Sequence, residues 1–155
     1  MFDMNTFKMV HSELIMSIQY IEQDLKLVYA AVKGGDIDRN FAELEKMNLG
    51  KVICEFRDLD KKTGFAQFSD DSYNLLDEIR EIRNYWCHQC YLDFHYYSDP
   101  EEHYEAYSKV AERLHHDENR VFELQQRLEK LRKREVQKYN IRLFFGLLRQ
   151  SSHTL

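Results

Sequence analysis

The segment Arg83-Asn84-Tyr85-Trp86-Cys87-His88 carries the side chains of this chain that are best suited to chemistry. Arginine offers a planar fork of N–H donors for anionic oxygens, and histidine titrates near neutrality, so it can accept or donate a proton. With about 100° of rotation per helical residue, His88 lies about 140° round a helix from Arg83, and Asn84 shares a face with His88. The segment is therefore a candidate site for binding an anion and moving a proton.

Cys87 and Cys90 suggest a second kind of site, a pair of redox-active thiols. The run from Trp86 to Cys90 reads Trp-Cys-His-Gln-Cys, which matches the Trp-Cys-x-x-Cys of thioredoxin-like oxidoreductases. That motif needs a strand ahead of it, whereas the preceding residues here have helical periodicity. A reactive cysteine also prefers a helix N-terminus, and Cys87 is expected in mid-helix. We therefore expect no redox site.

A zinc site is a third interpretation of the same cysteines. A structural zinc ion needs a second closely spaced pair of ligands. The histidines available to complete a site with Cys87 and Cys90 are His95, His103, His115 and His116, and none lies at a convincing spacing. We predict no metal and expect both cysteines to fill small gaps beside Trp86.

Composition places the chain among ordinary folded proteins. Its 155 residues are 43% hydrophobic with one proline and five glycines, which suits one helical domain over 1–155. The start lacks a basic region followed by an apolar run, and no stretch approaches the ~20 apolar residues that span a bilayer, so we expect no membrane association. Three cysteines, an odd number, fit reduced thiols, and we expect a cytoplasmic protein.

Charge is unevenly distributed along the chain. The formal net charge is -5, but residues 126–150 contain eight basic and two acidic side chains, a net +6, which leaves -11 for the rest. This basic C-terminal helical extension could meet phosphate, or it could pack against acidic surfaces. We favour an interpretation without phosphate binding, because basic helix faces are usually only solvated.

Apolar periodicity predicts helices almost throughout. We expect a helix over 5–33, shorter helices over 36–47 and 49–59, a loop over 61–64, and a helix from the cap candidates at 69–72 to about Tyr97. Ser98-Asp99-Pro100 predicts the next helix start. The core stripe of the helix that carries Arg83 is predicted to be Leu75, Ile79, Ile82, Trp86 and Cys90.

The last helix shows three- and four-residue steps like those of a coiled coil. Its seam is predicted to be Tyr107, Val110, Leu114, Val121, Leu124, Leu128 and Leu131, with Asp117 as the only polar member. The tail over 140–149 adds an apolar patch of Ile141, Leu143, Phe144, Phe145, Leu147 and Leu148. An apolar patch of this kind needs a surface to cover it.

Apolar and aromatic residues also lie away from the core stripe of the helix that carries Arg83. Tyr85, Tyr91 and Leu92 are expected on its outer side. A helix that is apolar over most of its circumference is usually covered on both sides. We therefore expect a homodimer through the face with His88 and the tyrosines, which would bring two Arg/His sets together.

The segment from Glu78 to His88, Glu-Ile-Arg-Glu-Ile-Arg-Asn-Tyr-Trp-Cys-His, resembles the signature of HEPN domains. The family motif is arginine, often followed by asparagine, then histidine after four to six intervening residues, and Arg83, Asn84 and His88 match it. The long first helix followed by short helices is similar to the family's layout over residues 5–140. The resemblance implies an up-and-down all-α helical bundle that is typically dimeric.

Many members of that family are metal-independent endoribonucleases, acting as toxins of toxin-antitoxin pairs or in antiviral defence. The resemblance therefore implies RNA as substrate, no cofactor, and an antitoxin or other protein as partner. Catalysis would fall to Arg83, Asn84 and His88, with Arg80, Tyr85 and Tyr91 as binding residues. Other members are non-catalytic modules for dimerisation or partner binding, and a nucleotide-binding module is a further alternative.

Overall fold

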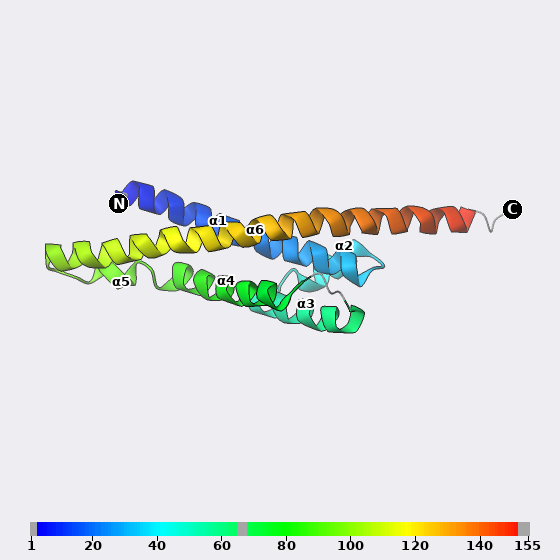
Figure 1. Cartoon of the computed structure of the whole chain (residues 1–155), viewed down its shortest axis with the longest axis horizontal. Coiled ribbons are helices and arrows are strands. Elements are labelled where there is room, and N and C mark those ends of the chain that lie inside the picture. Colours follow the sequence, from blue (N-terminus) through cyan, green and yellow to red (C-terminus); the bar gives the residue numbers. More distant parts are fainter. Residues whose placement is uncertain (1–2, 65–67, 152–155) are drawn as a thin grey trace. The chain divides into compact units, whose positions relative to one another are not determined.

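The computed structural model describes residues 3–64 and 68–151, with side chains described as far as residue 143. Within these ranges it has six helices and no strand (Figure 1), which confirms the all-α prediction. The helices are α1 (Met4–Lys33), α2 (Ile37–Leu44), α3 (Leu49–Thr63), α4 (Asp70–His88), α5 (Leu92–His95) and α6 (Pro100–Ser151). In the described part of the chain, no helix is both long and apolar enough to cross a membrane.

The chain forms two compact units. The first unit comprises residues 1–21 and 68–125, and the second comprises 22–67 and 126–155. Helices α1 and α6 contribute to both units, whereas α4 and α5 belong to the first and α2 and α3 to the second. The two units carry opposite net charges. The first unit has six basic and sixteen acidic side chains, a net -10, and the second has sixteen and eleven, a net +5.

The core of the first unit is the one that periodicity predicts. All five residues of the predicted stripe are buried, four of them in α4 and Cys90 just after its end, and so are the seam residues of α6 that fall in this unit. An aromatic cluster closes the core, with the Phe7 ring 5.9 Å from Phe94 and 5.5 Å from Tyr107, centroid to centroid. The N-terminal half of α1 is thereby joined to α5 and to the start of α6.

In the second unit, polar contacts secure the basic half of α6. Arg132 Nε lies 2.8 Å from Asp24 Oδ1, an ion pair without hydrogen-bond geometry. The Tyr139 hydroxyl donates to the Gly35 carbonyl at 2.7 Å, and Arg142 donates to the Ala31 carbonyl at 3.3 Å. These contacts support the interpretation in which the basic segment packs against its own fold.

Other basic side chains of this half of α6 pair along the helix itself. Lys133 contacts Glu129 at 2.6 Å, and both Arg134 and Lys138 contact the buried carboxylate of Glu135, at 3.1 and 2.9 Å. Three of the eight basic side chains of 126–150 are therefore paired with the two acidic side chains of the same segment.

Helix starts follow the predicted capping residues. The Ser69 hydroxyl accepts from the Ser72 amide at 3.3 Å, and Asp99 accepts from the amides of Glu101 and Glu102 at 2.9 and 3.0 Å. These side chains satisfy amide groups that have no partner inside the helix. The predicted loop at 61–64 is wrong at its start, since α3 continues to Thr63 and ends at Gly64 with a left-handed backbone (φ 62°).

The prediction of one helix to about Tyr97 is wrong. Helix α4 ends at His88, because the amides of both Gln89 and Cys90 donate to the Tyr85 carbonyl, at 2.8 and 3.1 Å. This double acceptance breaks the regular ladder, and the chain restarts as the short α5. The break turns Phe94, which is 5% exposed, into the aromatic cluster around Phe7.

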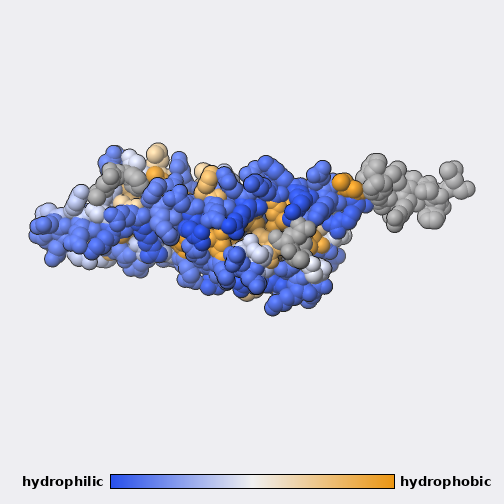
Figure 2. All heavy atoms as spheres, in the orientation of Figure 1, coloured by the Kyte–Doolittle hydropathy of each residue, from blue (hydrophilic) through white to orange (hydrophobic). Residues whose placement is uncertain are grey.

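Hydrophilic residues dominate the visible surface, with hydrophobic residues in limited patches between them (Figure 2). Among the residues of the predicted apolar tail, Ile141 and Leu143 are exposed. The remaining members, Phe144, Phe145, Leu147 and Leu148, lie outside the residues whose side chains are described.

Candidate functional site

Helix α4 places the Arg/His motif in its last two turns. Arg83 is half-buried at the edge of the core stripe, while Asn84 and His88 are exposed. Among the residues that the structure describes, the side chains of these three have no hydrogen-bond or ion-pair partner. A half-buried guanidinium usually has an anionic partner, because desolvating an unpaired charge is unfavourable. Arg83 is therefore available to bind an anion from outside.

The motif residues lie on one side of α4. At about 100° per residue, Arg83 and His88 bound an arc of about 140°, and Arg80 and Asn84 fall between them. Arg80 contacts the exposed Glu81, with Nη2 2.8 Å from Oε1. Arg83 and His88 within one copy thus lie at opposite edges of a surface that Asn84 and Arg80 occupy, rather than side by side.

Tyr85 and Tyr91, the other predicted binding residues, are engaged within the first unit. The Tyr85 hydroxyl donates to Asp93 Oδ2 at 2.7 Å, and the Arg113 guanidinium lies over the Tyr85 ring, 3.4 Å from its centroid. Burial and the bond to the Asp93 carboxylate raise the pKa of Tyr85. The hydrogen bonds from Gln89 and Tyr85 in turn lower the pKa of Asp93. Tyr85 therefore belongs to an ordered network and not to a free aromatic face.

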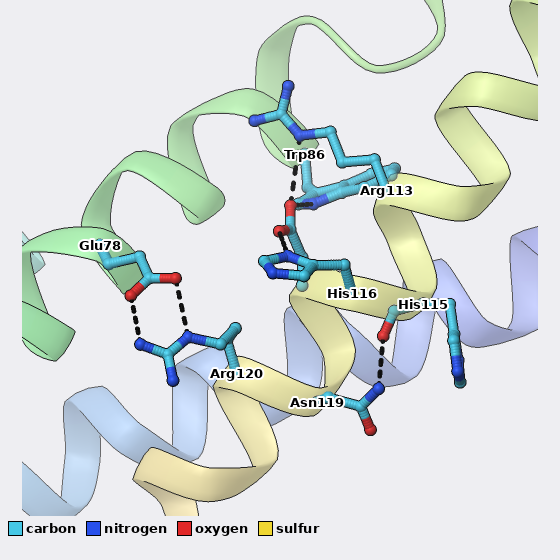
Figure 3. A network of polar contacts seen from close by, with 8 residues as sticks. Glu78, Trp86, Arg113, His115, His116, Asn119 and Arg120 are labelled. Carbon is cyan, nitrogen blue, oxygen red and sulfur yellow. Dashed lines mark hydrogen bonds and ion pairs between the residues drawn. The ribbon is translucent and has the colours of Figure 1, made fainter.

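Asp117 is the centre of a second network, drawn in Figure 3. Its side chain is almost fully buried and accepts from the indole N–H of Trp86 at 2.8 Å. Arg113 Nε and His116 Nδ1 lie 3.3 and 3.0 Å from the same carboxylate. The polar seam position that the sequence singles out is thus explained by a partner 31 residues away.

One further pair connects α4 to α6 in the first unit. Arg120 donates from Nε and Nη2 to the two carboxylate oxygens of Glu78, at 2.9 and 2.6 Å, and from Nη1 to Glu123 at 2.8 Å (Figure 3 shows the Glu78 pair). The hydrogen bonds from Arg120 lower the pKa of Glu78. Together with the Trp86–Asp117 bond, this pair ties α4 to α6 within the first unit.

His11 is a residue that sequence reasoning missed. Its Nε2 lies 3.0 Å from the Trp86 carbonyl, which can only accept, so Nε2 carries the proton. Nδ1 then accepts from the Tyr91 hydroxyl at 3.4 Å. Both contacts occur just where α4 ends. A helical-face histidine carries no sequence signal that would identify these partners, which are 75 and 80 residues away.

The cysteines behave differently from each other. Cys90 is buried, its thiol donates to the Trp86 carbonyl at 3.3 Å, and burial raises the pKa of this thiol to about 11. That shift is opposite to the one a redox-active or nucleophilic cysteine needs. Cys87 is exposed, so the expectation that it fills a gap beside Trp86 is wrong. Among the described residues, no three metal-ligating side chains are placed to hold an ion.

Beside the networks, the first unit contains a hollow of about 410 Å³ between the end of α4, α5 and the start of α6. It is lined by Tyr85, Asp93, Tyr97, Glu102, Glu105, Ala106, Lys109, Val110 and Arg113. A second hollow of about 400 Å³ is lined by Leu92, Asp93, Tyr96 and Tyr97. Neither is lined by Arg83, Asn84 or His88, so the hollows and the motif are different places on this unit.

No family model matches the chain, and no significant match is found among curated proteins or solved structures. A functional assignment therefore rests on the residues of the chain itself.

Proposed function

We propose that the chain is a HEPN-type, metal-independent endoribonuclease of the toxin or antiviral-defence kind. The observation that carries this proposal is the half-buried Arg83, which has no partner among the described residues and lies beside the exposed Asn84 and His88. Arg83 would bind the scissile phosphate and His88 would transfer protons. Asn84 would orient either the phosphate or the His88 side chain. Arg80 lies between Asn84 and Arg83 on the helix and would contact the RNA backbone.

RNA supplies its own nucleophile for such a reaction. The 2'-hydroxyl attacks the adjacent phosphorus and loses its proton to a base, while the bond to the 5'-oxygen breaks and that oxygen takes a proton from an acid. The products end in a 2',3'-cyclic phosphate and a 5'-hydroxyl. One His88 cannot hold both proton roles in a single turnover, so the proposal includes a homodimer through the Asn84/His88 face, with one His88 in each role.

The charge of the first unit limits how such an enzyme would hold RNA. Four of its six cations have an acidic partner: Arg80, Lys109, Arg113 and Arg120. Lys8 and Arg83 are the two without one among the described residues. Each phosphate contact to single-stranded nucleic acid contributes about -0.7 to the slope of log affinity against log salt. The two proposed phosphate contacts, Arg83 and Arg80, then give a shallow slope, about -1.4 per protomer, and hence weak, geometry-dependent RNA binding.

The same acidity favours a second candidate function, a non-catalytic dimerisation or partner-binding module. A unit of net charge -10 repels phosphate and attracts basic proteins. In that case Arg83 would bind a carboxylate of the partner, and the chain would not cleave RNA.

Cleavage of a mixed pool of single-stranded and structured RNA in EDTA tests the proposal. Arg83→Ala, Asn84→Ala and His88→Ala are compared with wild type and with two controls at exposed positions, Arg39→Ala and His115→Ala. We expect Arg83→Ala and His88→Ala to lose at least about a hundredfold in rate, the usual contribution of a general acid or base, while the controls cleave normally.

Cyclic-phosphate ends on the products, and sedimentation of the wild type as a dimer, would complete the support. If folded wild type does not cleave, or if all five variants cleave equally, the nuclease is ruled out and the module remains.

A further inference from the structure

The two hollows of the first unit adjoin, since Asp93 and Tyr97 line both. We call the combined surface the acidic tyrosine groove, and its members used below are Tyr85, Tyr96, Tyr97, Asp93, Glu102 and Glu105. Hollows of about 400 Å³ are at the lower end of the range for ligand sites, roughly 300–1,000 Å³. Each can take one or two long side chains.

The groove exposes more aromatic surface than folding of this unit requires. Tyr96 is 75% exposed and Tyr97 47%, and Leu92 beside them is 44% exposed. Six of the ten tyrosines of the chain fall within residues 84–108. Tyrosine combines a rigid apolar ring with a polar tip and is enriched in protein interfaces. Exposed rings that flank a hollow therefore indicate a surface for a partner.

The electrostatic character of the groove is acidic. Residues 84–108 contain five acidic side chains and no lysine or arginine. The two cations that line the groove are already opposed, Lys109 by Glu105 at 2.8 Å and Arg113 by Asp117 at 3.3 Å. The Glu102 carboxylate has no partner among the described residues. An anionic ligand would meet both this carboxylate and the net charge of -10, so phosphate compounds are disfavoured.

The groove already contains an example of the contact that it can offer. Arg113 lies over the Tyr85 ring, with Cζ 3.4 Å from the ring centroid, while its Nε contacts a carboxylate. A cation over an aromatic face is attracted by the ring quadrupole, and a neighbouring carboxylate adds a charge-assisted hydrogen bond. Tyr97 and Glu102 line the same hollow and offer an aromatic ring and a carboxylate, both open to solvent.

We propose that the acidic tyrosine groove docks a lysine- or arginine-rich segment of a partner protein. Basic side chains of the segment stack on Tyr96 and Tyr97, and their charged ends reach Glu102. The proposal does not depend on RNA cleavage, because none of the motif residues lines the groove.

Anisotropy titration of a fluorescent twelve-residue peptide of alternating lysine, arginine and alanine tests the docking at about 0.15 M salt, where long-range attraction is screened. We expect binding by the full chain and none by a peptide with glutamate at the basic positions. Glu102→Lys should weaken binding at least about tenfold, because it replaces attraction by repulsion at the contact. Tyr97→Ala should weaken it by a similar factor.

Matched controls separate the groove from the general acidity of the unit. Glu112→Lys makes the same charge change at an exposed α6 position outside the groove, and Tyr20→Ala removes an exposed ring from α1. Glu112→Lys should change the affinity less than about twofold, because long-range charge effects are screened at this salt concentration. Tyr20→Ala should also change it less than about twofold, because Tyr20 does not line the groove. Circular dichroism establishes that every variant is folded.

Equal weakening by Glu102→Lys and Glu112→Lys, or no peptide binding by wild type, would overturn the proposal. Direct binding of a single-stranded oligonucleotide that is tighter than that of the peptide, and that Tyr97→Ala abolishes, would also overturn it. Glu102→Lys should still cleave RNA at the wild-type rate if the nuclease proposal holds. If no variant cleaves RNA, the peptide titration still decides whether the groove binds its partner.

Discussion

Asp117→Ala is the substitution whose effect on stability follows most directly from the structure. It removes a hydrogen bond to a charged acceptor and leaves the buried indole N–H of Trp86 without a partner. Such a loss costs about 2–4 kcal/mol, since bonds to charged groups contribute about 1.5–3 kcal/mol and an unsatisfied buried donor about 1–3. For a chain of this size, 1 kcal/mol corresponds to about 2–4 °C, so Tm should fall by about 4–16 °C. Asp117→Asn keeps an oxygen acceptor and should cost less.

Trp86 is the only tryptophan of the chain, so its fluorescence reports on unfolding of the first unit. Urea titrations followed at this signal give the free energies of unfolding of wild type, Asp117→Ala and Asp117→Asn. Glu112→Ala, at an exposed position on the same helix, is the control and should stay within about 0.5 kcal/mol of wild type. The reasoning is refuted if Asp117→Ala matches that control, or if the two Asp117 variants are equally unstable.

Two other predictions concern titration and thiol chemistry. The pKa of Glu78 is lowered in the folded chain, so its pairing with Arg120 stabilises the fold above the ordinary pKa of 4.5 and is lost as pH falls through the lowered value. Urea midpoints of Glu78→Gln should therefore fall less steeply than those of wild type on acidification below pH 4.5, and parallel curves would contradict this. Cys54 and Cys87 are exposed and Cys90 is buried with a raised pKa. Ellman's reagent should thus modify two thiols rapidly in the native chain and the third only on unfolding, whereas three equally fast thiols would contradict the buried position of Cys90.

Helical periodicity predicted α1, the core stripe of α4 and the seam of α6 because each depends on local spacing. The break after His88 was missed, since nothing in the residues 89–97 prohibits a helix. It arises because Phe94 gains burial against Phe7, a contact between residues far apart in sequence. Periodicity shows which face of a helix is apolar. It does not show where packing against a distant part of the chain favours a break in the helix.

In the candidate site, too, the local sequence pattern did not reveal contacts between residues far apart in the chain. The sequence marked Asp117 as an unusual polar residue in an apolar seam but gave no partner, because Trp86 was expected only to fill the core. It also placed Arg83 at the edge of that core, where an ion pair would have been ordinary. Whether such an arginine is paired depends on every carboxylate that the fold brings near it, which a local pattern does not contain.

The Arg83/His88 surface and the acidic tyrosine groove both depend on the same contacts between α4 and α6. The contacts of Trp86 and Glu78 with α6 hold the last turns of α4, which carry both His88 on the motif side and Tyr85 on the groove wall. A variant that loosens these contacts would impair RNA cleavage and peptide docking together, whichever of them the chain performs. Glu102 lies on α6 and outside these contacts, whereas Arg83 and His88 project from α4 without described partners. Substitutions at these three positions therefore act on one surface each and can separate a nuclease from a docking module.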